Sequence, residues 1–375
     1  MIGKIVNKKI IIFITVYILF FLNVFAEEKN TCANGYRVIG DLHGMGHEII
    51  NLLDGYIDKD GNWIGEKNHC LIFVGDYIDR GEYSWETYNY VSYLQAQAIK
   101  NGQGKVIRLL GNHELLIFKK DFRNLILNGA CSWFNKTSDD FKTCEWVNTL
   151  ISKEDLLNKD ALYFIEKIFT PLVLEKSKQL KKDIEQGNIV AAFDFKNNKE
   201  DIVVTHAGIS DEVCEAFADE SSSTCFSCIF GKKPVVVTAT NITKWLNTEL
   251  VYGAFSNDHD HVIYSQRYGI FWNRLKSESG AVSKFCSKFS QIRGHTIKNE
   301  ITIDTLEKDK LLYSIDVGLY ENSNKEYLDI DPIKGTALIK TVHSNPSSSN
   351  KSKQIFDNFL KNYSIEKGDL HSCRK

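Results

Sequence analysis

The sequence has 375 residues, of which 43% are hydrophobic and 25% are charged, as in an ordinary globular protein. The 46 basic and 48 acidic residues leave a net charge of −2, so no basic excess suggests a nucleic-acid partner. Only four prolines are present, which excludes an extended proline-rich linker, and the length allows one large domain or one domain that carries a substantial insertion.

The first 26 residues have the pattern of a secretory signal peptide. Three lysines precede an apolar run over residues 10–25, and the small residue Ala26 follows that run. The alternative is an uncleaved anchor, because the run is only slightly shorter than a membrane span. We expect cleavage after Ala26, no transmembrane helix in the mature chain, and a location in the secretory pathway: the endoplasmic reticulum lumen, a vesicular compartment or the cell exterior.

The nine cysteines are compatible with such an oxidising compartment. Cys225 and Cys228 have the spacing of half a zinc site, but no second pair of ligands follows at a suitable distance. We therefore expect a disulfide that involves Cys214, Cys225 or Cys228, and another between Cys131 and Cys144. Because the number is odd, at least one cysteine is expected to be free or paired between molecules.

Five predicted strands end directly before polar side chains. Each is a short apolar run, and four of the five close with glycine, which is typical of a buried strand that delivers side chains to a sheet edge. The residues that follow the five runs are Asp41 and His43; Asp76, Asp79 and Arg80; Asn112 and His113; His206; and His295. Since glycine lets the backbone turn tightly, we expect these side chains to meet in one cleft.

Helical patterns over residues 46–56, 84–98 and 115–127 alternate with the first three strands, which indicates an α/β layer architecture. Helical patterns then replace strands over residues 128–198, including 142–150 and 155–186, with Pro171 interrupting the second. We interpret this stretch as a helical insertion, either a roof over the cleft or a surface elaboration.

Further along, the patterns predict a helix over residues 242–252 and strands over 301–305, 311–317 and 336–342. A Pro/Ser/Asn-rich loop is expected over 345–353 and a short helix over 355–363. The expected organisation is a signal peptide (1–26), a catalytic domain (27–343) with its insertion (128–198), and a linker with a C-terminal tail (344–375).

The side chains at the strand ends are oxygen and imidazole donors without a thiolate, a set suited to Mn, Fe or Zn. Asp41 and His43 would bind one ion. Asn112, His206 and His295 would bind a second, and Asp76 would bridge the two. Ions separated by about 3.5–4 Å convert a bridging water into a hydroxide nucleophile.

Neighbouring side chains are of the types that phosphoester hydrolysis would require beside such ions. His113 is expected to be the general acid, with its imidazole oriented by Asp79. Arg80 and Arg274 are expected to bind phosphoryl oxygens together with Asn112.

Three motifs resemble, in order and spacing, the signature blocks of the phosphoprotein phosphatase family. They are Gly-Asp-Leu-His-Gly from Gly40, Gly-Asp-Tyr-Ile-Asp-Arg-Gly from Gly75 and Gly-Asn-His-Glu from Gly111. The segments that contain His206 and His295 resemble two later blocks of the family, although Ala207 replaces a glycine. The helical insertion, Trp272-Asn-Arg and Asp316-Val-Gly are most similar to the Shewanella-like branch.

The resemblance implies the calcineurin-like α/β architecture, a central two-sheet β-sandwich flanked by helices, with two divalent metal ions at the strand ends. It also implies a protein phosphatase that acts on Ser, Thr or Tyr phosphomonoesters of phosphoproteins or phosphopeptides. One alternative is a dinucleoside-polyphosphate or nucleotide hydrolase with the same metal core. The other is an inactive phosphate-binding scaffold, which the intact set of ligands and catalytic side chains disfavours.

Overall fold

The computed structural model describes residues 32–119, 159–223, 237–253, 261–274, 286, 288–319, 324–343 and 346–372. These residues form two mixed sheets that share one hydrophobic core. The first sheet has the order β11 (Thr336–His343), β10 (Asn324–Asp331), β1 (Gly35–Ile39), β2 (His69–Phe73), β3 (Lys105–Leu109), β4 (Ile189–Val190). The second has the order β5 (Ala192–Lys196), β6 (Asp201–Thr205), β7 (Ser290–Arg293), β9 (Leu311–Ser314), β8 (Thr302–Thr305).

The two sheets pack face to face. Tyr36 of β1 stacks on Phe195 of β5 with ring centroids 3.9 Å apart, and Ala191 connects β4 of one sheet to β5 of the other. The predicted two-sheet sandwich flanked by helices is confirmed.

Parallel pairing brings the ligand-bearing strand ends to one edge. Strands β1, β2 and β3 run parallel in the first sheet, and β6 runs parallel to β7 in the second. The last four residues of β2 and of β3 are buried, which explains why they read as continuous apolar runs rather than as alternating ones. The chain leaves all five strands at the same end of the sandwich, as the sequence predicted.

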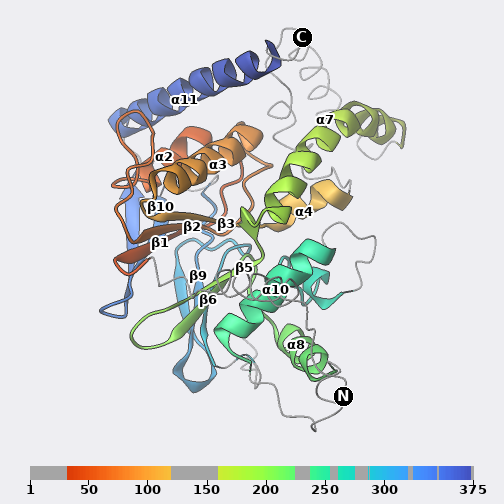
Figure 1. Cartoon of the computed structure of the whole chain (residues 1–375), viewed down its shortest axis with the longest axis vertical. Helices are drawn as coiled ribbons and strands as arrows, with labels where there is room; N and C mark the ends of the chain where they lie inside the picture. The colour runs from red at the N-terminus through yellow and green to blue at the C-terminus, as the bar shows by residue number, and fades with distance from the viewer. Residues whose placement is uncertain are drawn as a thin grey trace, which may run out of the picture.

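Helices cover the outer faces of the sandwich (Figure 1). On the first sheet lie η1 (Gly46–Glu48), α2 (Ile49–Leu52) and α3 (Ser84–Asn101), with α11 (Pro346–Ser372) packed on η1 and α2. On the second lie α10 (Ala239–Gly253) and, against it, α8 (Asp211–Ser223), which also contacts η4 (Val262–Tyr264). Helices α4 (Asn112–Lys119) and α7 (Lys159–Glu185) pack together, and η6 (Glu307–Asp309) lies between β8 and β9.

Several element predictions are wrong in extent. The predicted helix over residues 46–56 is only the short η1–α2 pair, and α7 continues through Pro171 without ending there. The predicted loop over 345–353 is the start of α11, since proline is favoured in the first turn of a helix and this helix buries Ile355, Phe356 and Phe359. The 142–150 helix, the signal peptide and the C-terminal half of the 115–127 helix lie outside the described residues.

Besides the short helices η4 and η6, four elements were not predicted: β4, β5, β10 and α8. Strand β4 has two residues, too few for a periodic signal, and it falls with β5 inside the stretch interpreted as helical. Strand β10 interleaves charged residues with Tyr327, Leu328 and Ile330, and its pairing with β1 and β11 is a tertiary contact.

Two disulfides join distant parts of the described chain. Cys32 pairs with Cys70 of β2, and Cys214 of α8 pairs with Cys286. The expected participation of Cys214 is therefore confirmed, whereas Cys225, Cys228 and the Cys131–Cys144 pair lie outside the described residues. None of the helices that the structure describes has the length and hydropathy needed to cross a lipid bilayer.

Candidate metal centre and active site

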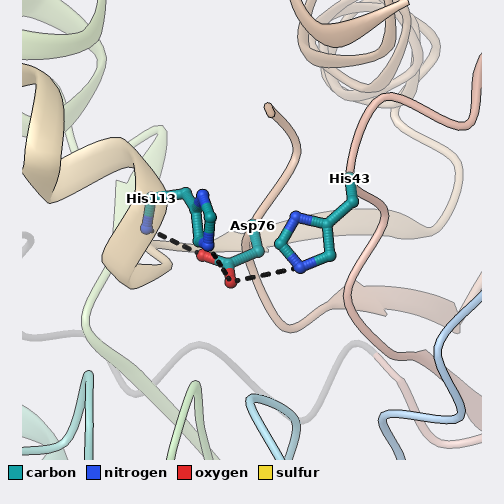
Figure 2. Close-up of side chains that lie close together, drawn as sticks. All are labelled: His43, Asp76 and His113. Carbon is teal, nitrogen blue, oxygen red and sulfur yellow. Dashed lines mark hydrogen bonds and ion pairs between the residues drawn. The ribbon is translucent and has the colours of Figure 1, made fainter. Parts of the chain in front are cut away.

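The side chain of Asp76 lies at the centre of the site. Its Oδ2 atom is 3.6 Å from Nε2 of His43, 3.4 Å from Nε2 of His206 and 3.9 Å from Nε2 of His113. Figure 2 shows the carboxylate between the rings of His43 and His113, which come from different segments of the chain. The structure thus places the Asp76 carboxylate among three imidazole rings.

Asn112 lies beside two histidines of the site, His206 and His295. Its Oδ1 atom is 2.9 Å from Nε2 of His206 and 2.9 Å from Nδ1 of His295. Asp41 is next to both histidines, because its Oδ1 is 3.9 Å from Nδ1 of His206 and its Oδ2 accepts the backbone N–H of His295 at 3.0 Å. All six residues predicted to bind metal are therefore brought together by the fold.

Backbone carbonyls fix the tautomers of two of these histidines. Nδ1 of His43 lies 3.1 Å from the carbonyl oxygen of Ile78, and Nδ1 of His206 lies 2.9 Å from that of Val74. A carbonyl oxygen accepts only, so Nδ1 carries the hydrogen and, in the neutral ring, Nε2 presents a lone pair. Those lone pairs face the oxygens of Asp76 and Asn112, an arrangement that requires a proton or a cation between the groups.

The donor set fits divalent cations. Ligand atoms of His43, Asp76 and His113 lie within 4.8 Å of one another, as do those of Asp76, His206 and His295. The donors are imidazole, carboxylate and amide groups, all buried except the half-buried His295, and such donors suit first-row transition metals. A divalent metal centre is thus compatible with the side chains at this edge.

The pKa values of these side chains reflect the same crowding. Burial lowers the pKa of His206, but Asp76 and then Asp41 outweigh it and raise the pKa to about 10. Burial and the positive charge of His206 lower the pKa of His295 to about 3. Burial raises the pKa of Asp76, yet the neighbouring imidazoles, above all His206 and His113, hold it well below its usual value. The negative charges of Asp76 and Asp41 thus favour a positive charge at His206.

His113 differs from the other imidazoles because a carboxylate holds its Nδ1. That atom is 2.6 Å from Oδ2 of Asp79, and Asp79 is held in turn by Ser84, whose Oγ accepts the Asp79 backbone N–H at 2.9 Å. Burial lowers the pKa of His113, but Asp76 and Asp79 raise it above its ordinary value. The ring is thus charged more readily than a free imidazole, while its Nε2 faces the cluster.

The two arginines act on different histidines of the cluster. Arg80 is half-buried, and its charge acts on His43 and His113. Arg274 is exposed, and its charge acts on His295. The structure therefore places a guanidinium group near each half of the site.

The backbone of the site is held in an unusual conformation. His43, Asp76, Asp79, Arg80 and His295 all have positive φ, between 42° and 69°. Non-glycine residues adopt this left-handed region at a cost that the surrounding structure must offset, and such residues cluster at functional sites.

Glu114, which the sequence suggested only as a supporting residue, holds one of these segments. Its carboxylate accepts the backbone N–H groups of Asp76, Tyr77, Ile78 and Gly111 at 2.8–3.3 Å. It thereby joins the turn after β2 to the turn after β3.

Asp316 is a further carboxylate of the site, and the sequence reading used it only as a mark of resemblance. It follows β9 and is buried, and burial together with the Asp316 charge raises the pKa of Asp41 well above its usual value. The signal for it was present, because an apolar strand followed by Asp-Val-Gly repeats the pattern seen at the other strand ends.

Comparisons with known proteins agree with this geometry. The family model described as calcineurin-like phosphoesterase matches residues 37–239, more than half of the chain. The chain is 41% identical over 80 residues to Shewanella-like protein phosphatase 1 of Plasmodium berghei, covering 21% of this chain and 22% of that protein. It is 25% identical over 328 residues to Shewanella-like protein phosphatase 2 of Arabidopsis thaliana, covering 82% of this chain and 77% of that protein.

A solved structure, the cold-active protein-tyrosine phosphatase of a psychrophilic Shewanella species, aligns over 82% of this chain and 80% of its own at 18% identity and a TM-score of 0.48. The alignment with the first relative spans less than a quarter of that relative's length. The resemblance to the Shewanella-like branch is confirmed. The chain belongs to the calcineurin-like phosphoesterase family.

Proposed function

We propose that the protein is a metal-dependent phosphoprotein phosphatase that hydrolyses phosphomonoesters on Ser, Thr or Tyr residues. The observation that carries this proposal is the pair formed by His113 and Asp79 beside the ligand cluster. Nδ1 of His113 is hydrogen-bonded to the Asp79 carboxylate, so His113 can present a proton on Nε2 to a leaving oxygen. The similarity to Shewanella-like protein phosphatases supports the same substrate class.

The residues of the chain have separate roles in this proposal. Asp41 and His43 would hold one ion, Asn112, His206 and His295 the other, and Asp76 both. Ions at these donors, which we expect to be Mn, Fe or Zn, would lower the pKa of a water molecule and offset the charge of the phosphoryl oxygens.

The arginines and His113 act on the substrate itself. Arg80 and Arg274 would bind phosphoryl oxygens from the two sides of the cluster, with the Asn112 amide as a further contact. His113 would donate its proton to the departing alkoxide or phenoxide, and Asp79 would keep the imidazole charged and oriented until it does.

The decisive experiment measures metal content and aryl-phosphate hydrolysis for the wild type and for His113→Ala. His113 lies near enough to Asp76 and His43 to be a ligand instead of an acid, and the two roles give different results. As an acid, its loss lowers kcat by about 10²–10⁴-fold and leaves the bound metal unchanged. Loss of one metal ion from the variant would instead make His113 a ligand.

Substrate comparison separates the remaining alternatives. Faster hydrolysis of phosphopeptides than of dinucleoside polyphosphates is expected, and the reverse order would favour the nucleotide hydrolase. A wild-type protein that binds no metal and is not activated by any divalent ion would support the phosphate-binding scaffold.

We further propose that the protein acts in the secretory pathway. The apolar N-terminal run and the two disulfides support this location, since disulfides persist in oxidising compartments. Reduced Cys214 and Cys286 in protein isolated under a thiol-blocking reagent would contradict it.

A further inference from the structure

Two loops of the site are joined backbone to backbone. We call residues 41–46 the first ligand loop and residues 75–83 the second ligand loop. Gly44 donates its N–H to the carbonyl of Tyr77 at 2.9 Å, and Gly81 donates its N–H to the carbonyl of His43 at 2.9 Å. Tyr83 donates its N–H to the carbonyl of Gly44 at 3.0 Å. His43 and Arg80 are therefore positioned by a shared layer of backbone.

The ring of Tyr83 lies on this layer. A Cβ atom placed on Gly46 would lie 2.6 Å from Cδ2 of Tyr83, so the ring rests directly against the end of the first ligand loop. The imidazole of His47 meets the same ring edge-on, with the centroids 6.0 Å apart. Tyr83 belongs to the second ligand loop, so its ring couples the two loops beyond their hydrogen bonds.

Helix α11 supplies the support behind Tyr83. Phe356 is completely buried and meets the Tyr83 ring edge-on at 5.4 Å and the Tyr90 ring edge-on at 5.8 Å. One turn earlier, Ser352 donates its hydroxyl hydrogen to Oδ1 of Asn51 of α2 at 2.6 Å. Figure 1 shows α11 lying along the outer side of α2 and α3, so a segment near the C-terminus packs behind loops from the first quarter of the chain.

We propose that Phe356 is a positioning residue, which acts through Tyr83 to hold the two ligand loops in register. Two of the residues next to the Tyr83 ring are held in place. Gly46 donates its N–H to Oγ1 of Thr87 at 2.9 Å, and Phe356 is buried in the core. Removing the Phe356 ring leaves a space into which Tyr83 can move. The second ligand loop, with Arg80, moves with it. The catalytic consequence rests on the proposed phosphatase function, whereas the structural coupling does not.

Phe359 offers a matched control on the same helix. It is also buried, and its ring packs on Tyr90 at 4.9 Å and Tyr93 at 5.3 Å, both on α3. Phe359→Ala and Phe356→Ala remove the same side chain from the same helix, so both should lower the melting temperature. Only Phe356→Ala should disturb the ligand loops.

Hydrogen exchange tests the coupling without reference to activity. In Phe356→Ala, the amides of Gly44, Gly81 and Tyr83 should exchange faster than in the wild type. In Phe359→Ala their exchange should stay at the wild-type rate while that of α3 rises. Unchanged loop exchange in Phe356→Ala, or an equal increase in Phe359→Ala, would overturn the proposal.

Kinetics test the consequence for catalysis, at a temperature where circular dichroism shows both variants folded. Phe356→Ala should lower kcat/KM for an aryl phosphate by about ten- to a hundredfold, because small misplacements of catalytic groups are costly. Phe359→Ala should retain kcat/KM, and Phe356→Leu, which refills most of the space, should recover much of the loss. Equal activity losses in the two alanine variants would overturn the positioning role. An inactive wild type would contradict the proposed function and leave the exchange result standing.

Discussion

Three imidazole rings, those of His43, His113 and His206, direct Nε2 toward the Asp76 carboxylate. The group that binds Nδ1 of each ring decides what that ring can do. His43 and His206 direct Nδ1 to backbone carbonyls, which leaves Nε2 available as a neutral ligand. His113 directs Nδ1 to the Asp79 carboxylate, which favours the charged ring. The same residue type is thus suited to metal binding in two places and, in the proposed mechanism, to proton donation in the third.

This difference predicts a shift in the pH dependence of Asp79→Asn. Asparagine keeps an oxygen that accepts the Nδ1 hydrogen but removes the negative charge, so the pKa of His113 falls. An acid with a lower pKa loses its proton at lower pH, and the alkaline limb of the kcat/KM profile should move to lower pH by about one unit or more. The measurement is the pH–rate profile for an aryl phosphate.

Asp331→Asn is the control for this shift. Asp331 also accepts hydrogen bonds through its carboxylate, from the N–H groups of Ile333 and Lys334, but it lies beside the start of β1, at the far end of the sheet from the site. Its profile should coincide with that of the wild type. An alkaline limb that stays in place in Asp79→Asn would show that Asp79 does not support the charged form of His113.

At the scale of elements, parallel strands and glycine turns bring the ligands together. The first and second ligand loops approach so closely that side chains are excluded between them. A Cβ atom on Gly81 would lie 2.5 Å from the carbonyl oxygen of Gly44, and also against that of His43. Neither obstacle is a flexible side chain, so the loops themselves would have to separate.

Gly81→Ala should therefore reduce activity by displacing His43 and Arg80. We expect a loss in kcat/KM of about tenfold or more, together with a lower melting temperature. Gly102→Ala is the control: it lies just beyond α3 with nothing within 4 Å of the added Cβ, although its φ of 60° makes alanine strained there. That variant should lose about 1 kcal/mol of stability and keep its activity. Full activity in Gly81→Ala would mean that the loop contact is not needed for catalysis.

At the scale of the molecule, one core spans both sheets, and the Cys214–Cys286 disulfide links two segments that are far apart in the sequence. The two cysteines are 72 residues apart, and the bond joins α8 to the residues that lead into β7 and His295. A cross-link over a loop of this length restricts the unfolded chain strongly.

Replacing both cysteines by serine should lower the free energy of unfolding by about 4 kcal/mol in the chain-entropy account. The midpoint of a urea transition measures this change. Because neither cysteine belongs to the cluster, kcat/KM at a temperature well below the transition should remain near the wild-type value. A selective loss of activity in a folded double variant would instead show that the disulfide positions His295.

The sequence by itself determined most of the polar side chains that meet at this edge, because each follows a short apolar strand, which is a local feature. Asp41, His43, Asp76, Asn112, His206 and His295 could be named without a structure for that reason. The same reasoning predicted α3 and α10, whose apolar positions recur with helical spacing.

Only the tertiary structure decided which distant segments lie together. Strand β10 pairs with β1 through residues almost 300 positions apart, as in the 2.8 Å ion pair of Arg37 with Asp329, and no local pattern in β10 announces that partner. Phe356 behind Tyr83, Asp316 beside Asp41 and the pairing of Cys214 with Cys286 are of the same kind. Such contacts depend on the packing of the whole core, and a local pattern carries no information about the far partner.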